Sequence, residues 1–242
     1  MKKIYEKNEL NFALIWIGVY VVLFSVADSI SGTIGIAKLV TAPLCIVMTA
    51  MIYMWICGNG LKEKYGLCKF KGEAKTYLYF VPLVLLASTN VWYGVRLNLS
   101  VLETILYIIS MLCVGFLEEV IFRGFLFKAM CKSNLKSAIV ISSITFGIGH
   151  IVNLLNGSGT LETVLQVCYA IAIGFVFTIL FYYGKGLWPC IITHGVINSL
   201  SVVANREADS VMGDMIAALF LCVVSIGYAL YILKCNKKSE KM

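Results

Sequence analysis

Long apolar runs separated by short polar segments recur along the whole chain. A helix needs roughly 17–25 predominantly apolar residues to cross the hydrocarbon core of a bilayer. Because the segment between Asp28 and Lys38 is only mildly polar, seven such runs is an alternative to the count of eight that we favour. We predict membrane-spanning helices at 11–27, 39–57, 76–92, 104–127, 137–155, 163–183, 187–204 and 215–233.

This pattern predicts an all-α fold, a polytopic membrane helix bundle of about eight transmembrane helices. The gaps are short, and the sequence has no internal repeat, Pro-rich linker or low-complexity tract, which indicates one membrane domain. We divide it into N-terminal helices at 1–103, a core with the candidate chemistry at 104–204, and a last helix with a cytoplasmic tail at 205–242.

Composition supports a membrane protein and excludes an ordinary soluble domain. Hydrophobic residues make up 60% and charged residues 14% of the chain, and the mean hydropathy is +0.88. A soluble domain has about 45–50% apolar and about 25% charged residues. The net charge of +7 comes from basic residues that stand between apolar runs and form no continuous stripe. We therefore expect the lipid bilayer, and no nucleic acid, as a partner.

Basic residues are distributed unequally between alternate sides of the predicted spans. With the N-terminus inside, sixteen of the 20 Lys and Arg residues lie in cytoplasmic segments, whereas Lys38, Arg96 and Arg206 lie on the opposite side. This is the positive-inside pattern, so we predict that both termini are cytoplasmic and that the number of spans is even. No small-residue cleavage site follows the first run, and we expect it to stay as a membrane helix.

Within these span limits, every Asp, Glu, Lys or Arg falls on the fourth span, as Glu118, Glu119 and Arg123. Each such residue costs roughly 2.5–3.5 kcal/mol on insertion scales and usually faces the bundle interior. Glu119 and Arg123 are four residues apart and can pair on one helix face, and that pair can be purely structural. Glu118 is left without a partner, which makes it the candidate for chemistry.

The chain has 2 histidines, and both lie inside predicted spans: His150 in the fifth and His194 in the seventh. Asn198 follows His194 by four residues, so an imidazole and a carboxamide share one helix face. A rise of about 1.5 Å per residue places both histidines, Asn198 and Glu118 in one layer near the middle of the membrane. A shared site is therefore geometrically allowed.

Two hydrolytic chemistries suit this set. A carboxylate and an imidazole can deprotonate and orient a water molecule, while a second imidazole and an amide stabilise the oxyanion. Alternatively, Glu118, His150 and His194 are a ligand set for zinc with an open position for water. A proton-coupled transporter would use the same groups as a relay, but the internal repeats typical of transporters are absent from the sequence.

Three motifs resemble those of the CPBP family of intramembrane proteases, also called the CAAX protease and bacteriocin-processing (Abi) family. The first is E-E-x-x-x-R at Glu118, Glu119 and Arg123. The second is F-x-x-x-H at Phe146 and His150, and the third is H-x-x-x-N at His194 and Asn198. The resemblance covers about residues 104 to 204.

The resemblance implies an eight-helix membrane peptidase in which Glu118 and His150 activate water. His194 and Asn198 would support the oxyanion or help to bind a metal. Glu119 and Arg123 would orient the first glutamate, with Phe146 as a further supporting residue. Members are often classed as metalloproteases, and metal-free catalysis has been argued for some, so zinc is one alternative here.

The expected substrate is a membrane-associated peptide or protein, and the expected location of this short, lysine-rich chain is the bacterial cell membrane. Bacterial relatives are associated with peptide maturation or bacteriocin immunity. The alternative function is a non-proteolytic immunity or scaffold protein that retains the protease fold.

Overall fold

A computed structural model describes residues 1–155, 157–205 and 210–239, and this part of the chain is helical without a β-strand. One isolated antiparallel bridge joins Val95 to Ala204. The predicted all-α class is confirmed. The helices are α1 (Lys2–Lys7), α2 (Glu9–Ile34), α3 (Thr41–Gly58), η1 (Leu78–Phe80), α4 (Val81–Ser88), η2 (Thr89–Val91), α5 (Val101–Glu118), η3 (Glu119–Phe127), α6 (Lys128–Cys131), α7 (Leu135–Ile148), η4 (Gly149–Ile151), α8 (Val152–Leu155), α9 (Thr160–Gly184), α10 (Trp188–Leu200) and α11 (Val211–Ser239).

Within the described residues, 6 continuous helices are long and apolar enough to cross a membrane. They coincide with six of the eight predicted spans. Large apolar side chains on the outer faces of the bundle are exposed, for example Val84 at 67%, Leu219 at 65% and Ile192 at 59%. Exposed apolar surface on this scale matches a lipid environment. The chain is an integral, multi-pass membrane protein. The six helices are Glu9–Ile34, Thr41–Gly58, Val101–Cys131, Leu135–Leu154, Thr160–Gly184 and Val211–Lys237.

The other two predicted spans, 76–92 and 187–204, fall on shorter helices. Leu78, Tyr79 and Phe80 have positive φ angles of 50°, 51° and 59°, so the right-handed helix begins only at α4. The α10 helix has 13 residues, or about 20 Å at 1.5 Å per residue, against a hydrocarbon core of about 30 Å. Eight crossings therefore stay a prediction.

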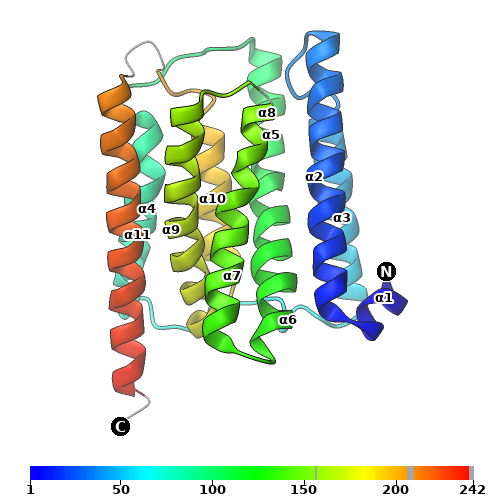
Figure 1. Cartoon of the computed structure of the whole chain (residues 1–242), viewed down its shortest axis with the longest axis vertical. Coiled ribbons are helices and arrows are strands. Elements are labelled where there is room, and N and C mark those ends of the chain that lie inside the picture. The colour runs from blue at the N-terminus through cyan, green and yellow to red at the C-terminus, as the bar shows by residue number, and fades with distance from the viewer. Residues whose placement is uncertain (156, 206–209, 240–242) are drawn as a thin grey trace.

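Successive long segments run in alternating directions, including α4 and α10 (Figure 1). The N-terminus and the C-terminal part of α11 lie at the same end of the bundle. We call it the termini end, and it also holds the loops at 59–77, 132–134 and 185–187. The far end holds 35–40, 92–100, 157–159 and 201–205. This agrees with both termini on one side of the membrane, and the cytoplasmic assignment stays a prediction. Arg206 and Lys241, which entered the charge count, lie outside the described residues.

The first spanning helix is longer than predicted, because α2 continues to Ile34 and ends at Gly35, which has a left-handed φ of 82°. Asp28 therefore lies inside this helix, and the prediction that only the fourth span carries charge is wrong. Asp28 pairs with Lys38 at 2.7 Å and accepts a hydrogen bond from Thr41. The apolar run resumes after Asp28, which is why one carboxylate does not end the helix.

Two close helix crossings hold the centre of the bundle together. A Cβ atom on Gly115 of α5 would lie 2.6 Å from the backbone N of Gly195 in α10. A Cβ atom on Gly147 of α7 would lie 2.9 Å from the backbone N of Ile171 in α9. Small residues allow helix backbones to approach this closely in membranes. Three of these four helices, α5, α7 and α10, carry or adjoin the three polar motifs.

Candidate active site

The helix that carries the acidic pair changes its geometry at that pair. The α-helix α5 ends at Glu118, and the π-helix η3 begins at Glu119 and continues for 9 residues, all of them buried. The π-helical form is rare and is frequently found at functional sites. It places Glu119 and Arg123 inside the bundle, where each has a fully buried side chain.

Glu119 links Arg123 to His194. One carboxylate oxygen, Oε1, accepts a hydrogen bond from Arg123 Nη1 at 3.0 Å and lies 2.9 Å from His194 Nδ1. The predicted pairing of Glu119 with Arg123 is confirmed. Because an ionised carboxylate only accepts, His194 Nδ1 must donate, and the second ring nitrogen, Nε2, is left for other partners.

Glu118 contacts two other helices. The Tyr20 hydroxyl of α2 donates to Glu118 Oε1 at 2.6 Å, and His194 Nε2 lies 3.6 Å from Glu118 Oε2. The prediction that Glu118 has no partner is therefore wrong. Sequence reasoning missed Tyr20, which stands in an apolar run outside the three motifs and is one of 13 tyrosines.

The residues with a predicted supporting role make their contacts around His194 rather than around Glu118. The Arg123 guanidinium lies over the ring of Phe146, 4.0 Å from its centroid. Gly174 of α9 leaves room for it, since a Cβ atom there would lie 3.0 Å from Arg123 Nη2. The family resemblance implied that Glu119 and Arg123 orient Glu118, whereas in the structure their side chains contact His194 and aromatic rings.

Phe146 stands beside both histidines. Its ring centroid is 5.3 Å from that of His150 and 5.5 Å from that of His194, with edge-to-face geometry. His150 lies in the short helix η4, and its Nδ1 is 3.2 Å from the carbonyl oxygen of Phe146. This contact fixes the imidazole orientation and leaves Nε2 as the other functional nitrogen.

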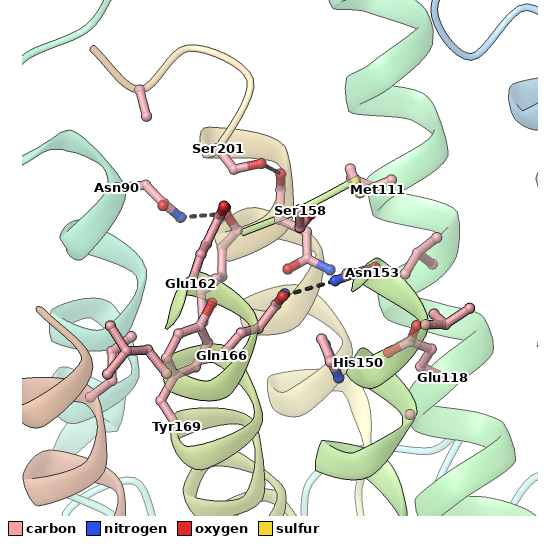
Figure 2. A pocket seen from close by; sticks show the side chains of 18 of the residues that line it. Asn90, Met111, Glu118, His150, Asn153, Ser158, Glu162, Gln166, Tyr169 and Ser201 are labelled. Atoms are coloured by element: carbon pink, nitrogen blue, oxygen red, sulfur yellow. Dashed lines mark hydrogen bonds between the residues drawn. The ribbon is translucent and has the colours of Figure 1, made fainter. Parts of the chain in front are cut away.

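A cavity of about 480 Å³ connects these groups. Glu118, His150 and Asn198 line it, and His194 joins it through its contact with Glu118. Figure 2 shows Glu118 and His150 towards the same part of the cavity, with Asn153 and Gln166 hydrogen-bonded to each other nearby at 2.8 Å. Three of the four residues predicted for catalysis therefore line one cavity, and the fourth, His194, contacts Glu118.

Glu118, His150 and His194 are the possible zinc ligands. Among the described residues, no three side chains of His, Cys, Asp or Glu are grouped to hold one metal ion. Glu118, His150 and His194 therefore do not form a zinc ligand set in this arrangement. Zinc binding itself stays a prediction from the resemblance.

The comparisons with known proteins agree with this site. Residues 100–200 match the family model described as type II CAAX prenyl endopeptidase Rce1-like. A protein of Bacillus subtilis (strain 168) named "Putative membrane peptidase YdiL" is 24% identical over 188 residues, which are 72% of this chain and 72% of that protein. No solved structure matches the chain.

The helical membrane fold and these matches support a membrane-embedded protease. The matched segment resembles the Rce1-like CAAX endopeptidases, a branch of the CPBP family, and it contains all three motifs. The resemblance predicted from the motifs is confirmed over this segment.

Proposed function

We propose that the protein is an intramembrane endopeptidase that hydrolyses a peptide bond of a membrane-associated peptide or protein with a water molecule activated by Glu118 and His150. The observation that carries this proposal is the position of Glu118. Its carboxylate is held by Tyr20 at 2.6 Å, lies 3.6 Å from His194, and faces a cavity that His150 also lines. A carboxylate and an imidazole at one cavity surface are the groups that general acid–base hydrolysis needs.

In the first step, Glu118 accepts a proton from a water molecule that His150 orients, and the water oxygen attacks the carbonyl carbon of the substrate. The negative charge moves to the carbonyl oxygen. The Asn198 amide donates a hydrogen bond to this oxyanion, and so does His194 Nε2 when the ring is protonated. Donors placed in advance for such a charge typically contribute about 2.7–4 kcal/mol each.

In the second step, the proton held by Glu118 is transferred to the amide nitrogen as the carbon–nitrogen bond breaks. The products are a carboxylic acid and an amine, so atoms and charge balance without a further reactant. Glu119 would keep the His194 ring in place throughout, because its Oε1 is bonded to Nδ1 on the side away from Glu118. Arg123 balances the charge of Glu119.

The test is cleavage of a membrane peptide by purified protein in liposomes. Glu118→Gln removes the proton acceptor with little change of shape, and we expect cleavage to be lost while thermal unfolding is unchanged. Glu103→Gln, in the capping box of the same helix, is the matched control; glutamine is also accepted at this position, so cleavage should persist. Retained cleavage by Glu118→Gln would contradict the proposed role of Glu118, whereas no cleavage by the wild-type protein would favour the non-proteolytic alternative.

The metal alternative has its own measurement. Metal content of the purified protein, compared with cleavage before and after chelation, separates the two mechanisms. The arrangement of the described side chains favours cleavage that survives chelation, and a loss of cleavage that zinc restores would reverse this assignment.

A further inference from the structure

The cavity at Glu118 is elongated along one helix face. Tyr107, Met111, Val114 and Glu118 of α5 all line it, and their spacing of four, three and four residues places them on one face of the helix. From Tyr107 to Glu118 this face is about 16 Å long at 1.5 Å per residue. That length accommodates about five residues of extended chain at 3.3 Å each.

The walls of the cavity continue towards the far end of the bundle. Lys38, Tyr93, Ser158 and Ala204 line it, and all four lie in the far-end segments. Figure 2 shows Asn90, Ser158 and Ser201 towards one end of the cavity and Glu118 and His150 towards the other. Among the described lining residues, none comes from the termini-end loops at 59–77, 132–134 or 185–187.

The opposite end of the cavity is closed by packed aromatic side chains. Every residue of η3, which follows Glu118 towards the termini end, is buried. Phe125 of η3 packs against Tyr65 of the loop at 59–77, with ring centroids 4.9 Å apart, and against Phe12 of α2 at 5.0 Å. Tyr65 itself is 1% exposed. A polypeptide therefore has no path to Glu118 through this layer without unpacking it.

The distribution of charge indicates which side of the membrane each end faces. The termini end carries the cluster of basic residues, and the far end carries Lys38 and Arg96 among the described residues. By the positive-inside rule the termini end is cytoplasmic and the far end is extracytoplasmic. The end of the cavity that the far-end segments line then faces the outside of the cell.

We propose that the substrate reaches Glu118 from the extracytoplasmic side, as an extended segment of an exported peptide or of the outer part of a membrane protein. This inference rests on the proposed function for the cleavage itself, but the direction of access follows from the cavity and the charge distribution.

The direction of access can be measured without any cleavage assay. In full-length protein whose nine free cysteines are replaced by serine or alanine, Ser158→Cys introduces a thiol in the cavity wall at the far end. Ser133→Cys introduces one in the exposed loop at the termini end. A charged, membrane-impermeant methanethiosulfonate should label Ser158→Cys in intact cells and not in inside-out vesicles. Ser133→Cys should show the reverse, and unfolded protein should label at both positions.

Labelling of Ser158→Cys from the cytoplasmic side only, from both sides, or from neither side in a protein that melts like its parent would overturn the proposal. A second arm uses the adduct itself. Modification of Ser158→Cys should block cleavage of a membrane peptide, whereas modification of Ser133→Cys should leave cleavage unchanged. If Ser158→Cys labels from outside but no variant cleaves, the access route stands and the proposed peptidase function fails, so the two failures are distinguishable.

Discussion

Glu118 and Glu119 are adjacent in the chain but are held by different partners. Glu118 receives a hydrogen bond from Tyr20, while Glu119 receives its bonds from Arg123 and His194. The second carboxylate therefore acts on the imidazole, and the first is left with one oxygen, Oε2, on the side of His194. This division suits one glutamate for proton transfer and the other for holding a histidine.

Tyr20 is a positioning residue in this arrangement, and Tyr20→Phe tests it. The ring packing is retained, while the hydroxyl that fixes Glu118 is lost. A hydrogen bond to a charged group contributes about 1.5–3 kcal/mol, so we expect kcat to fall by about tenfold to 100-fold with KM nearly unchanged.

Tyr107→Phe, at another position in the same cavity wall, is the matched control and should keep kcat within a factor of about two, because its hydroxyl makes only a 3.3 Å contact with Ser201. Steady-state kinetics with thermal unfolding of each variant provide the readout. Equal losses in both variants, or a loss explained by a lower melting temperature, would argue against the positioning role.

At the scale of single residues, the sequence alone was sufficient to identify the residues of the three motifs as candidates. Buried Glu, His and Asn side chains are costly in a membrane, so their occurrence in apolar runs is a strong signal. A tyrosine gives no such signal, because its ring is compatible with an apolar segment. The hydrogen bond between Tyr20 and Glu118 joins residues 98 positions apart, and pairing at that distance depends on the packing of α2 against η3.

At the scale of helices, the contact of α5 with α10 sets the distance between the glutamates and His194. Gly115 lies three residues before Glu118, and Gly195 directly follows His194. A Cβ atom on Gly115 would meet three backbone atoms of α10 at 2.6, 2.8 and 2.9 Å. Backbone atoms cannot rotate away, so even one methyl group must separate the two helices.

We therefore expect Gly115→Ala to lower the free energy of unfolding by about 1–3 kcal/mol. We also expect it to reduce cleavage roughly 100-fold, the effect of a displacement of about 1 Å at a catalytic group. Gly18→Ala is the control, because Gly18 is in the middle of α2 and a Cβ atom there meets nothing within 4 Å. It should leave both quantities unchanged or raise stability slightly. Cleavage by Gly115→Ala at the wild-type rate would show that the crossing does not set the site.

Helix type and length were the least predictable features at this scale. Apolar periodicity does not distinguish a π-helix from an α-helix, so η3 gave no sign in the sequence. The predicted limits of α2 stopped at Asp28 because a charge in an apolar run was read as its end, whereas Lys38 and Thr41 satisfy that carboxylate. The predicted span at 76–92 was too long because nothing in the sequence indicated left-handed backbone at Leu78–Phe80.

At the scale of the whole molecule, alternating helix directions place the N-terminus and the C-terminal part of α11 at one end of the bundle (Figure 1). We expect alkaline phosphatase, which folds only outside the cytoplasm, to be inactive when joined to the C-terminus. The same enzyme joined after Leu97, in the far-end loop at 92–100, should be active. A green fluorescent protein fusion should give the opposite pattern. Active phosphatase at the C-terminus would contradict the orientation that the basic residues predict.

The class of molecule was the most predictable property. An excess of apolar residues this large has no place in a chain of 242 residues except in lipid, and three motifs in separate helices were enough to indicate the family. The number of membrane crossings was harder to predict from the sequence. The helix α10 is short for a bilayer, and yet it carries His194 and Asn198. The sequence also held no information on the shape of the cavity, which depends on side chains from helices far apart in the chain.

The bond between Arg123 and Glu119 has a consequence for biogenesis. The two residues are within one segment, so they can neutralise each other as soon as that segment enters the membrane, before α10 has been synthesised. His194 arrives about seventy residues later, and a ribosome adding about 5–20 residues per second needs several seconds to make it. During that interval Arg123 neutralises Glu119 in the nascent chain, but the second imidazole is still missing. Under the proposed mechanism, the site is complete only after α10 has been inserted.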